Sequence, residues 1–262
     1  MKQTAKRENN ELGATMYGYL ELLTLALIPG FIALDLVYHR RSYPTPRFWR
    51  LRATAVTAGI VIFTIWVAGV WGRVFGEMHL FDLGGLGAIG GAAVGVLVYE
   101  LIHYGYHRAA HRWDWLWRAG HQMHHSAESL DAFGAYYLHP LDAALFTTWS
   151  SLVFFPLLGV TLEAGILGAL FLTFNAMFQH ANIRTPRWLG YLVQRPESHT
   201  IHHARGIHRY NYSDLPLWDI LFGTFRNPET VEGVETGFYN GASSRVLEAL
   251  IGKDVTRPKA AA

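Results

Sequence analysis

Cysteine is absent from this 262-residue chain, and charged residues make up only 16% of it. The lack of cysteine excludes disulfides, thiolate zinc sites, iron–sulfur clusters and cysteine nucleophiles, so any bound metal must be held by nitrogen or oxygen. With 22 Lys and Arg against 20 Asp and Glu, the formal charge of +2 provides no broad basic field. We therefore expect no nucleic-acid partner.

Long apolar runs are what the sequence has instead. Apolar residues make up 51% of the chain, and a helix needs about 20 of them to cross the hydrocarbon core of a membrane. Candidate segments are residues 16–38, 53–75, 83–102, 141–160 and 163–180. The last two are near the minimum length and predict a tight hairpin with a bend near Pro156. The sequence thus predicts an all-α integral membrane protein with about four to five transmembrane helices.

Two features of these segments bear on how they pack and where they lie. Gly87, Gly91 and Gly95 recur every four residues, the small-residue spacing that lets membrane helices approach closely. No small-residue cleavage site follows the first apolar run, so we expect that run to remain as a membrane anchor.

Arginine is distributed unevenly between the short loops. Residues 39–52 hold five arginines, whereas residues 76–82 hold neither Lys nor Arg. By the positive-inside rule the first loop is cytoplasmic, which places the segments after the third and fifth helices on the same side. Lys2, Lys6 and Arg7 argue for the opposite orientation.

The chain reads as a single membrane domain over residues 1–262. We expect the first three helices within residues 15–102, a histidine-rich cap segment at 103–140 and the hairpin at 141–180. A second histidine-rich cap segment follows at 181–240, and a peripheral tail at 241–262. The two cap segments should meet at the cytoplasmic face of a bacterial inner membrane or of the endoplasmic reticulum.

Histidine is the polar residue that this apolar chain concentrates. Twelve of the 14 histidines lie between His103 and His208. Residues three or four apart share a helix face, so each trio of the two HxxHH blocks should point toward one spot. Nine positions have this spacing or accompany it: His107, His111, His121, His124, His125, His180, His199, His202 and His203.

Neutral imidazole is a common ligand of transition metals, and protonated imidazoles at this spacing would repel one another. Nine ligands exceed the needs of one ion and suggest two. A zinc protease is disfavoured, because the motifs hold no HExxH sequence and no general-base carboxylate. A proton relay would string its histidines along a path. A membrane protein that only binds or transports zinc or iron stays open.

Several stretches together resemble the fatty acid hydroxylase superfamily, also called the sterol desaturase family. They are ELIHYGYHRAAHRWDWLWRAGHQMHHS, LHPLDA, FQHANI and HTIHHARGIHRYNYSDLPLWDILFGTF, within about residues 98–226. The form found in alkylglycerol monooxygenase is especially similar around residues 107–126 and 218–225.

The resemblance implies that the nine histidines are the metal ligands, with the first motif starting at His107 rather than at His103. Some relatives have another ligand where this chain has Ala176, so that position would be filled by water, Asn175, Gln179 or His139. Additional or supporting roles are implied for His103, His139, His208, Glu100 and Asp219, and Asp219 would hold the distal N–H of a ligand histidine.

The resemblance also implies the activity. Two iron ions, replaceable by zinc in purified material, would use O2 to hydroxylate an unactivated C–H bond of a fatty acyl, sterol or ether lipid; desaturation at the same site is the alternative. The lipid would enter between the third helix and the hairpin. Electrons would come from a ferredoxin, rubredoxin or cytochrome b5-type protein with its reductase. Surface arginines could meet such an acidic donor: Arg108, Arg112, Arg118, Arg205 and Arg209.

Overall fold

The computed structural model describes residues 2–76 and 78–259. Within these ranges the chain is helical and forms no strand, apart from an isolated β-bridge between Ala204 and Thr236. The longest helices are α1 (Lys2–Val37), α2 (Trp49–Phe75), α3 (Gly87–Arg112), α6 (Pro140–Leu152) and α7 (Leu162–His180). The predicted all-α fold is confirmed.

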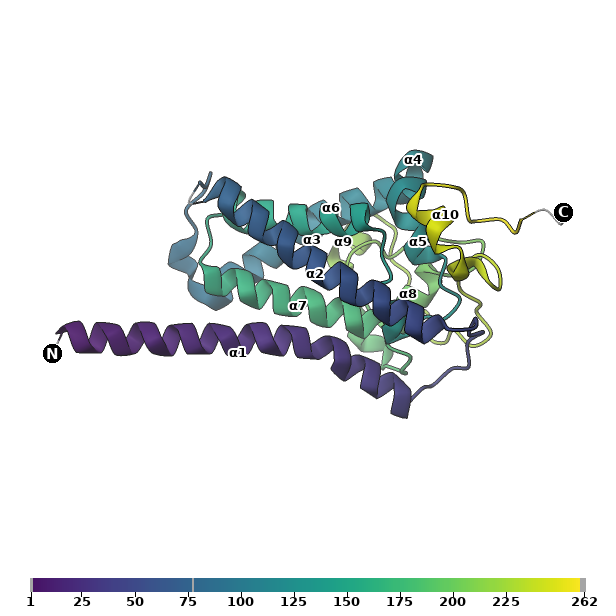
Figure 1. Cartoon of the computed structure of the whole chain (residues 1–262), viewed down its shortest axis with the longest axis horizontal. Helices are drawn as coiled ribbons and strands as arrows, with labels where there is room; N and C mark the ends of the chain where they lie inside the picture. Colours follow the sequence, from purple (N-terminus) through teal and green to yellow (C-terminus); the bar gives the residue numbers. More distant parts are fainter. Residues whose placement is uncertain (1, 77, 260–262) are drawn as a thin grey trace.

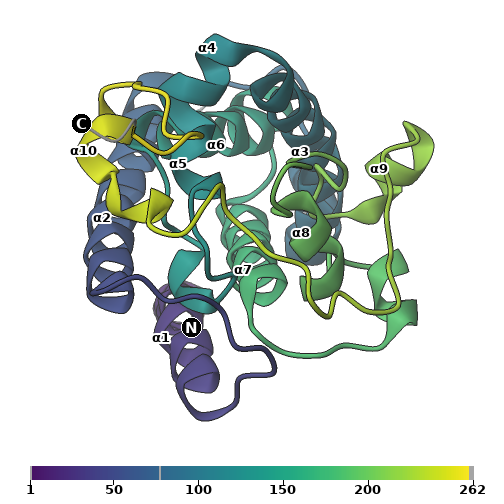
Figure 2. The same cartoon turned by 90° about the vertical axis from the view of Figure 1, so that its right-hand side faces the viewer.

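The long helices run roughly side by side, and shorter elements form a cap at one end of them (Figure 1). Seen from the cap end, α5 and α10 lie on one side and α8 and α9 on the other (Figure 2). The short α-helices are α4 (Asp114–Leu116), α5 (Gln122–His125), α8 (Pro196–His202), α9 (Pro216–Leu221) and α10 (Val246–Leu250). The 3-10 and π-helical turns are η1 (Gly84–Leu86), η2 (Trp117–His121), η3 (Ala132–Gly134), η4 (Val153–Leu157), η5 (Arg187–Tyr191) and η6 (Ala242–Ser244).

Local sequence sets where these helices begin. Pro140 and Pro196 stand at the first helical position of α6 and α8, where the missing N–H costs nothing. Thr161 caps α7 by accepting the N–H of Ala164. His139 caps α6 in the same way, because its Nδ1 accepts the N–H of Leu141 at 3.0 Å.

Four helical segments are long and apolar enough to cross a membrane: Tyr17–Val37, Trp49–Phe75, Gly84–Arg112 and Leu162–His180. They match four of the five predicted segments. The third runs ten residues further than the predicted end at residue 102, and so carries two candidate ligands, His107 and His111, from the bundle into the cap.

The fourth predicted segment, residues 141–160, is not among the membrane-crossing helices. Its α-helix ends at Leu152, and a π-helical turn containing Pro156 follows. Thr147, Ser150 and Ser151 make this stretch more polar than the others, and the three side chains line an internal cavity. Their place inside the bundle explains why the segment is less apolar than a lipid-facing helix.

The sequence predicted a tight hairpin of residues 141–180, but α6 and α7 diverge. Helix α6 packs against α2, whereas α7 packs against α1 and α3. The glycine spacing in α3 does support close packing, as predicted. A Cβ added at Gly91 would lie 2.8 Å from the Cβ of Ala164 in α7, and one at Gly95 would collide with the ring of Phe154.

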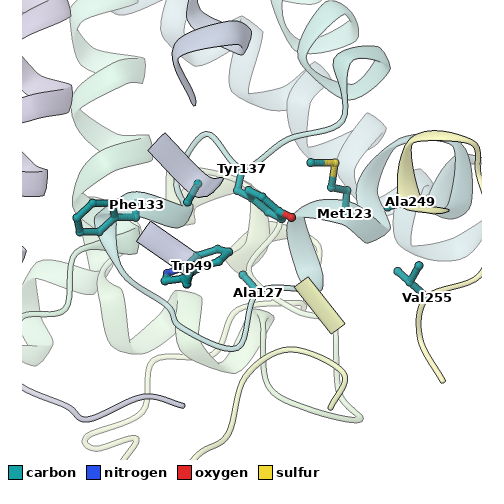
Figure 3. Close-up of a cluster of buried hydrophobic side chains, with 8 residues drawn as sticks. Trp49, Met123, Ala127, Phe133, Tyr137, Ala249 and Val255 are labelled. Atoms are coloured by element: carbon teal, nitrogen blue, oxygen red, sulfur yellow. The ribbon is translucent and has the colours of Figure 1, made fainter. Parts of the chain in front are cut away.

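A hydrophobic core beneath the cap joins parts of the chain that are far apart in sequence. Trp49, at the start of α2, packs edge-on against Tyr137, and both are buried with Met123 of α5 (Figure 3). Ala249 and Val255 from the tail complete this core. Burying each large apolar side chain contributes roughly 1.5–3 kcal/mol, so the core fixes α5 against the bundle.

Residues 241–259 therefore dock against the cap, whereas a peripheral tail was expected over residues 241–262, the last three of which lie outside the described residues. Gln122 of α5 donates its amide to the carbonyl of Lys253 at 2.7 Å and accepts the N–H of Val255 at 3.2 Å. Glu128 accepts the N–H groups of Gly241 and Ser243. The tail contains many polar residues, so its sequence did not predict that it packs against the cap.

Candidate metal centre

The nine predicted histidines all come together at the cap end of the bundle. They form two groups, in each of which one ligand atom per residue lies within 4.8 Å of all the others. The five-histidine cluster consists of His107, His111, His121, His125 and His202. The four-histidine cluster consists of His124, His180, His199 and His203.

Each HxxHH block is divided between the two clusters, whereas the sequence predicted that each trio would converge on one spot. The first block sends His121 and His125 to the five-histidine cluster and His124 to the other. The second block sends His199 and His203 to the four-histidine cluster and His202 to the five-histidine cluster. Neighbouring residues on a helix point about 100° apart, so adjacent histidines in a block face different centres.

The ring nitrogens within each cluster face one another closely. In the five-histidine cluster the Nε2 of His121 lies 2.9 Å from that of His107 and 3.0 Å from that of His125. In the four-histidine cluster the Nε2 distances are 3.2 Å from His124 to His180, 3.1 Å from His180 to His199 and 3.0 Å from His199 to His203. Two nitrogen ligands that lie about 2.1 Å from the same ion, at a right angle to each other, are about 3 Å apart. The observed distances between the ring nitrogens are similar.

The distal nitrogens of several histidines are held by acceptors outside the clusters. The Nδ1 atoms of His107, His202 and His180 lie 2.7, 2.7 and 2.8 Å from the backbone carbonyls of Tyr212, Tyr210 and Ala176, respectively. A carbonyl can only accept, so each Nδ1 must carry the proton. Each Nε2 then presents a lone pair to the cluster.

Lone pairs facing one another at this distance repel unless a cation lies between them. The buried Nε2 atoms of His111 and His202 have no hydrogen-bond partner among the described residues. Burial and the neighbouring histidines also lower the pKa of His124, His125, His199, His202 and His203 well below the usual 6.5. Neutral imidazoles with inward lone pairs fit a metal ion in each cluster.

Asp142 is a site residue that the sequence reading did not single out. Its Oδ2 lies 2.8 Å from Nδ1 of His121, and its Oδ1 accepts the hydroxyl of Tyr106 at 2.5 Å. This carboxylate therefore fixes the ring of His121, the role predicted for Asp219. Its position in the first turn of α6, two residues after the HP pair, was the available signal.

Asp219 acts on the site indirectly. Its carboxylate accepts the N–H of Tyr212 at 2.9 Å, the N–H of Ser213 at 2.8 Å and the hydroxyl of Thr224 at 2.6 Å. It thereby positions the carbonyl of Tyr212, which accepts from His107. No contact of Asp219 with a clustered histidine is found in the described part of the chain.

Two further histidines lie beside the clusters, and one lies apart. Nδ1 of His208 is 3.1 Å from Nδ1 of His125, on the side of that ring turned away from the cluster. His103 stacks on His107 with ring centroids 5.4 Å apart, and its Nδ1 faces Glu100 at 3.4 Å. His139 caps α6 and contacts the carbonyl of Leu250, so it lies outside both clusters.

The two amides proposed as substitutes for the missing ligand are held through their nitrogens, and their side-chain oxygens have no hydrogen-bond partner among the described residues. Asn175 donates to the backbone carbonyl of Asp214, and Gln179 donates to its carboxylate, each at 2.9 Å. Ala176 lines an internal cavity instead. The four-histidine cluster is therefore one protein ligand short of its neighbour, on the side where Ala176 meets the cavity.

This cavity has a volume of about 430 Å³ and reaches from the membrane helices to both clusters. Its walls include Ile28 of α1, Val61 of α2, Phe146 of α6 and Leu172 of α7. At the cap end it is bordered by five clustered histidines: His107, His121, His124, His180 and His199. The divergence of α6 and α7 creates this space. Tyr99 and His103 of α3 border it, as do residues of α1 and α2.

Comparison with known proteins agrees with this arrangement. The family model described as fatty acid hydroxylase matches residues 92–224, just over half of the chain. The chain belongs to the fatty acid hydroxylase family. The matched region contains all nine clustered histidines, together with Asp142 and Asp214. Helices α1 and α2 and the tail lie outside it, although α1 and α2 line the cavity.

Curated relatives support the family assignment. Alkylglycerol monooxygenase from Homo sapiens is 33% identical over 143 residues, which cover 50% of this chain and 30% of the relative. Sphinganine C4-monooxygenase 1 from Arabidopsis thaliana is 27% identical over 154 residues, 57% and 59% of the two chains. A very-long-chain aldehyde decarbonylase from Oryza sativa subsp. indica is 29% identical over 153 residues, 55% and 58%.

The aligned segments span between about a third and three fifths of these fatty acid hydroxylase relatives. No solved structure matches the chain. The apolar helices and the family membership indicate a multi-pass membrane protein, and the histidine clusters indicate a metal site.

Proposed function

We propose that the protein is an integral-membrane di-iron oxygenase that hydroxylates an unactivated C–H bond of a lipid, using O2 and external electrons. One observation carries the proposal: the four-histidine cluster is one ligand short on the side where an apolar cavity reaches it from the membrane helices. The names of the relatives, two of which are monooxygenases of lipid compounds, support it.

The residues of the chain would hold and orient both reactants. Two iron ions in the clusters would supply the activation of O2 and the oxidation of the C–H bond. Asp142 and the carbonyls of Tyr210 and Tyr212 fix the histidine rings, so the lone pairs are aimed before a metal binds. The apolar walls would exclude water and align one carbon of a lipid chain with the open side.

A lipid would reach the cavity from within the bilayer. Thr24 and Leu25 of α1 and Val61 and Ile65 of α2 border the cavity at membrane depth. We propose that the acyl or alkyl chain enters between these helices and α6 and α7. The metal-bearing cap would then lie at the cytoplasmic face, as the arginine-rich loop predicts.

Electrons would arrive from the other side of the centre. A second cavity, of about 340 Å³, is lined by His111, Arg112, Asp114, Trp117 and His208. Trp117 packs against His111 and His125, with ring centroids 5.1 and 5.2 Å apart. We propose that a ferredoxin, rubredoxin or cytochrome b5-type protein docks over this surface.

Two of the five candidate docking arginines already have acidic partners within the chain. Arg118 pairs with Asp114, and Arg205 pairs with Glu235 at 2.8 Å. Arg108, in contrast, donates to the hydroxyl of Tyr104 at 2.9 Å. Arg112 lines the second cavity and is the arginine best placed to meet a donor there.

The test is O2 consumption by purified, iron-loaded protein with a chemical or protein reductant and a lipid extract. An oxygenated lipid formed in proportion to the O2 consumed is the expected result. An alkene product would instead assign desaturation. Iron or zinc binding without O2 consumption under any reductant would contradict both enzyme functions and favour a metal-binding or transport protein.

A further inference from the structure

Two neighbouring elements on one side of the cap expose apolar side chains. Helix α9 and the turn η5 pack against each other, and the rings of Tyr191 and Phe225 lie 5.5 Å apart. Along each segment the exposed residues recur with the spacing i, i+3 and i+4, which places them on one face. Six side chains, each between 43% and 63% exposed, form what we call the α9–η5 face: Trp188, Tyr191, Leu192, Leu217, Ile220 and Leu221. Neighbouring exposed apolar side chains of this kind mark contact with a membrane or with another protein.

The α9–η5 face lies at the level where the hydrocarbon core of the membrane should end. A helix crosses that core in about 20 residues, so a span that begins at Gly84 leaves it near Tyr104. The ring of Tyr104 stacks on that of Phe222 with centroids 5.0 Å apart, and its hydroxyl lies 3.1 Å from that of Thr224. Figure 2 shows α9 beside α3, at the outer edge of the bundle. The face therefore lies at the boundary between the acyl chains and the head groups.

The charges and aromatic rings around this face favour lipid over a second copy of the chain. Trp188 and Tyr191 each combine an apolar ring with one polar group, and such side chains are enriched at membrane interfaces. Of the four carboxylates in residues 184–229, only that of Glu229 is exposed. Three exposed arginines make no salt bridge within the described structure: Arg184, Arg187 and Arg226. Lipid phosphates would neutralise these arginines, whereas a symmetric dimer would bring the same charges together.

We propose that the α9–η5 face is an interfacial anchor, inserted into the head groups and outer acyl chains of the leaflet on the cap side. The inference goes beyond the proposed function and does not depend on it. The anchor lies on the side of the bundle away from α2 (Figure 2). It therefore fixes the cap to the membrane without obstructing the place where α1 and α2 border the cavity.

The composition of the chain makes this anchor easy to probe. Because the sequence contains no cysteine, a single introduced cysteine can carry a label without any other being removed. Leu221→Cys places the label on α9, and Leu192→Cys places it directly after η5. These two leucines are 62% and 60% exposed, so their replacement leaves the buried core intact. Glu232→Cys, in an exposed turn between α9 and η6, is the matched control.

The experiment measures the quenching of an environment-sensitive fluorophore attached to each cysteine, with the full-length chain in nanodiscs. The lipids carry a nitroxide either near the head group or at the end of the acyl chain. We expect the labels on Leu221→Cys and Leu192→Cys to emit at shorter wavelength than the label on Glu232→Cys. The shallow nitroxide should quench those two labels at least about threefold more strongly than the control, and more strongly than the deep nitroxide does.

Three results would overturn the anchor. The first is equal quenching of all three labels in protein that elutes as a folded species. The second is stronger quenching by the deep nitroxide, which would place the face inside the hydrocarbon core. The third is emission at shorter wavelength without quenching, together with a dimer mass in detergent, which would assign the face to a second copy of the chain. Each of these results would leave the proposed oxidation of a lipid unaffected.

Discussion

The two histidine clusters both draw residues from the two HxxHH blocks, yet they differ in the number of histidines and in their surroundings. The five-histidine cluster contains His121, fixed by Asp142, and reaches a cavity on the outer surface through His111. The four-histidine cluster has Ala176 one turn before His180, beside the lipid-sized cavity. Under the proposed function, the first site would favour metal retention and electron entry, whereas the second would leave space for O2 and substrate.

The largest effects are expected from replacing two adjacent histidines that belong to different clusters. His124→Ala removes a ligand of the four-histidine cluster, and His125→Ala removes one of the other cluster. Each should lower the metal content from about two ions to about one and reduce turnover at least about hundredfold. Metal analysis and product formation measure both effects, with His139→Ala as the control outside the clusters. Two metals retained in His124→Ala would contradict the assignment.

Making the clusters alike is the next test. Ala176→His would place an imidazole one turn before His180, on the side of the four-histidine cluster that borders the cavity. We expect the metal to resist a chelator about tenfold better while turnover falls at least about tenfold, because the added ligand occupies the open side. Ala169→Val, which narrows the same cavity further along α7, should leave chelator resistance unchanged. Higher turnover in Ala176→His would refute the role of the open side.

Asp142→Asn weakens only the five-histidine cluster. Losing the carboxylate beside Nδ1 of His121 should lower the metal affinity of that cluster by about 10- to 100-fold. Titration with a competing chelator would show one weakened site and one unchanged site. Asp114→Asn, on the exposed surface of α4, is the control. Equal weakening of both sites would mean that Asp142 acts on the whole cap.

Gly95→Ala should affect both clusters least. An added Cβ would collide with the ring of Phe154, so the packing of α3 must adjust. We expect a loss of about 1–3 kcal/mol of stability, seen as a lower midpoint of thermal unfolding. Metal content should stay at the wild-type level, since the glycine lies far from the cap. Gly105→Ala, where an added Cβ meets nothing within 4 Å, is the matched control in the same helix.

The sequence was sufficient to predict the helical class, four helices long and apolar enough to cross a membrane, and the nine histidines that cluster at the cap. The sequence could not predict how the histidines are divided between the two clusters. Helical spacing indicates which side chains are near one another, but not which cluster each side chain faces. Residues 141–160 are not among the four membrane-crossing helices, and the sequence alone does not distinguish hydroxyl side chains that line a cavity from other tolerated polar residues.

Backbone conformation explains another part that sequence reasoning missed. His208, Tyr210 and Asn211 adopt positive φ angles of 42°, 72° and 51°. Such angles are uncommon for residues other than glycine, and no pattern in this segment predicts them. This segment brings the carbonyls of Tyr210 and Tyr212 against His202 and His107. The support of the ligands therefore depends on a loop geometry that only the structure provides.

The most direct test of the account is the number of iron ions bound per chain after anaerobic reconstitution with ferrous iron. The account predicts about two ions per chain, one in each cluster. About one ion per chain, or none, in protein that elutes as a folded species would contradict the assignment of two metal sites to the divided histidine blocks.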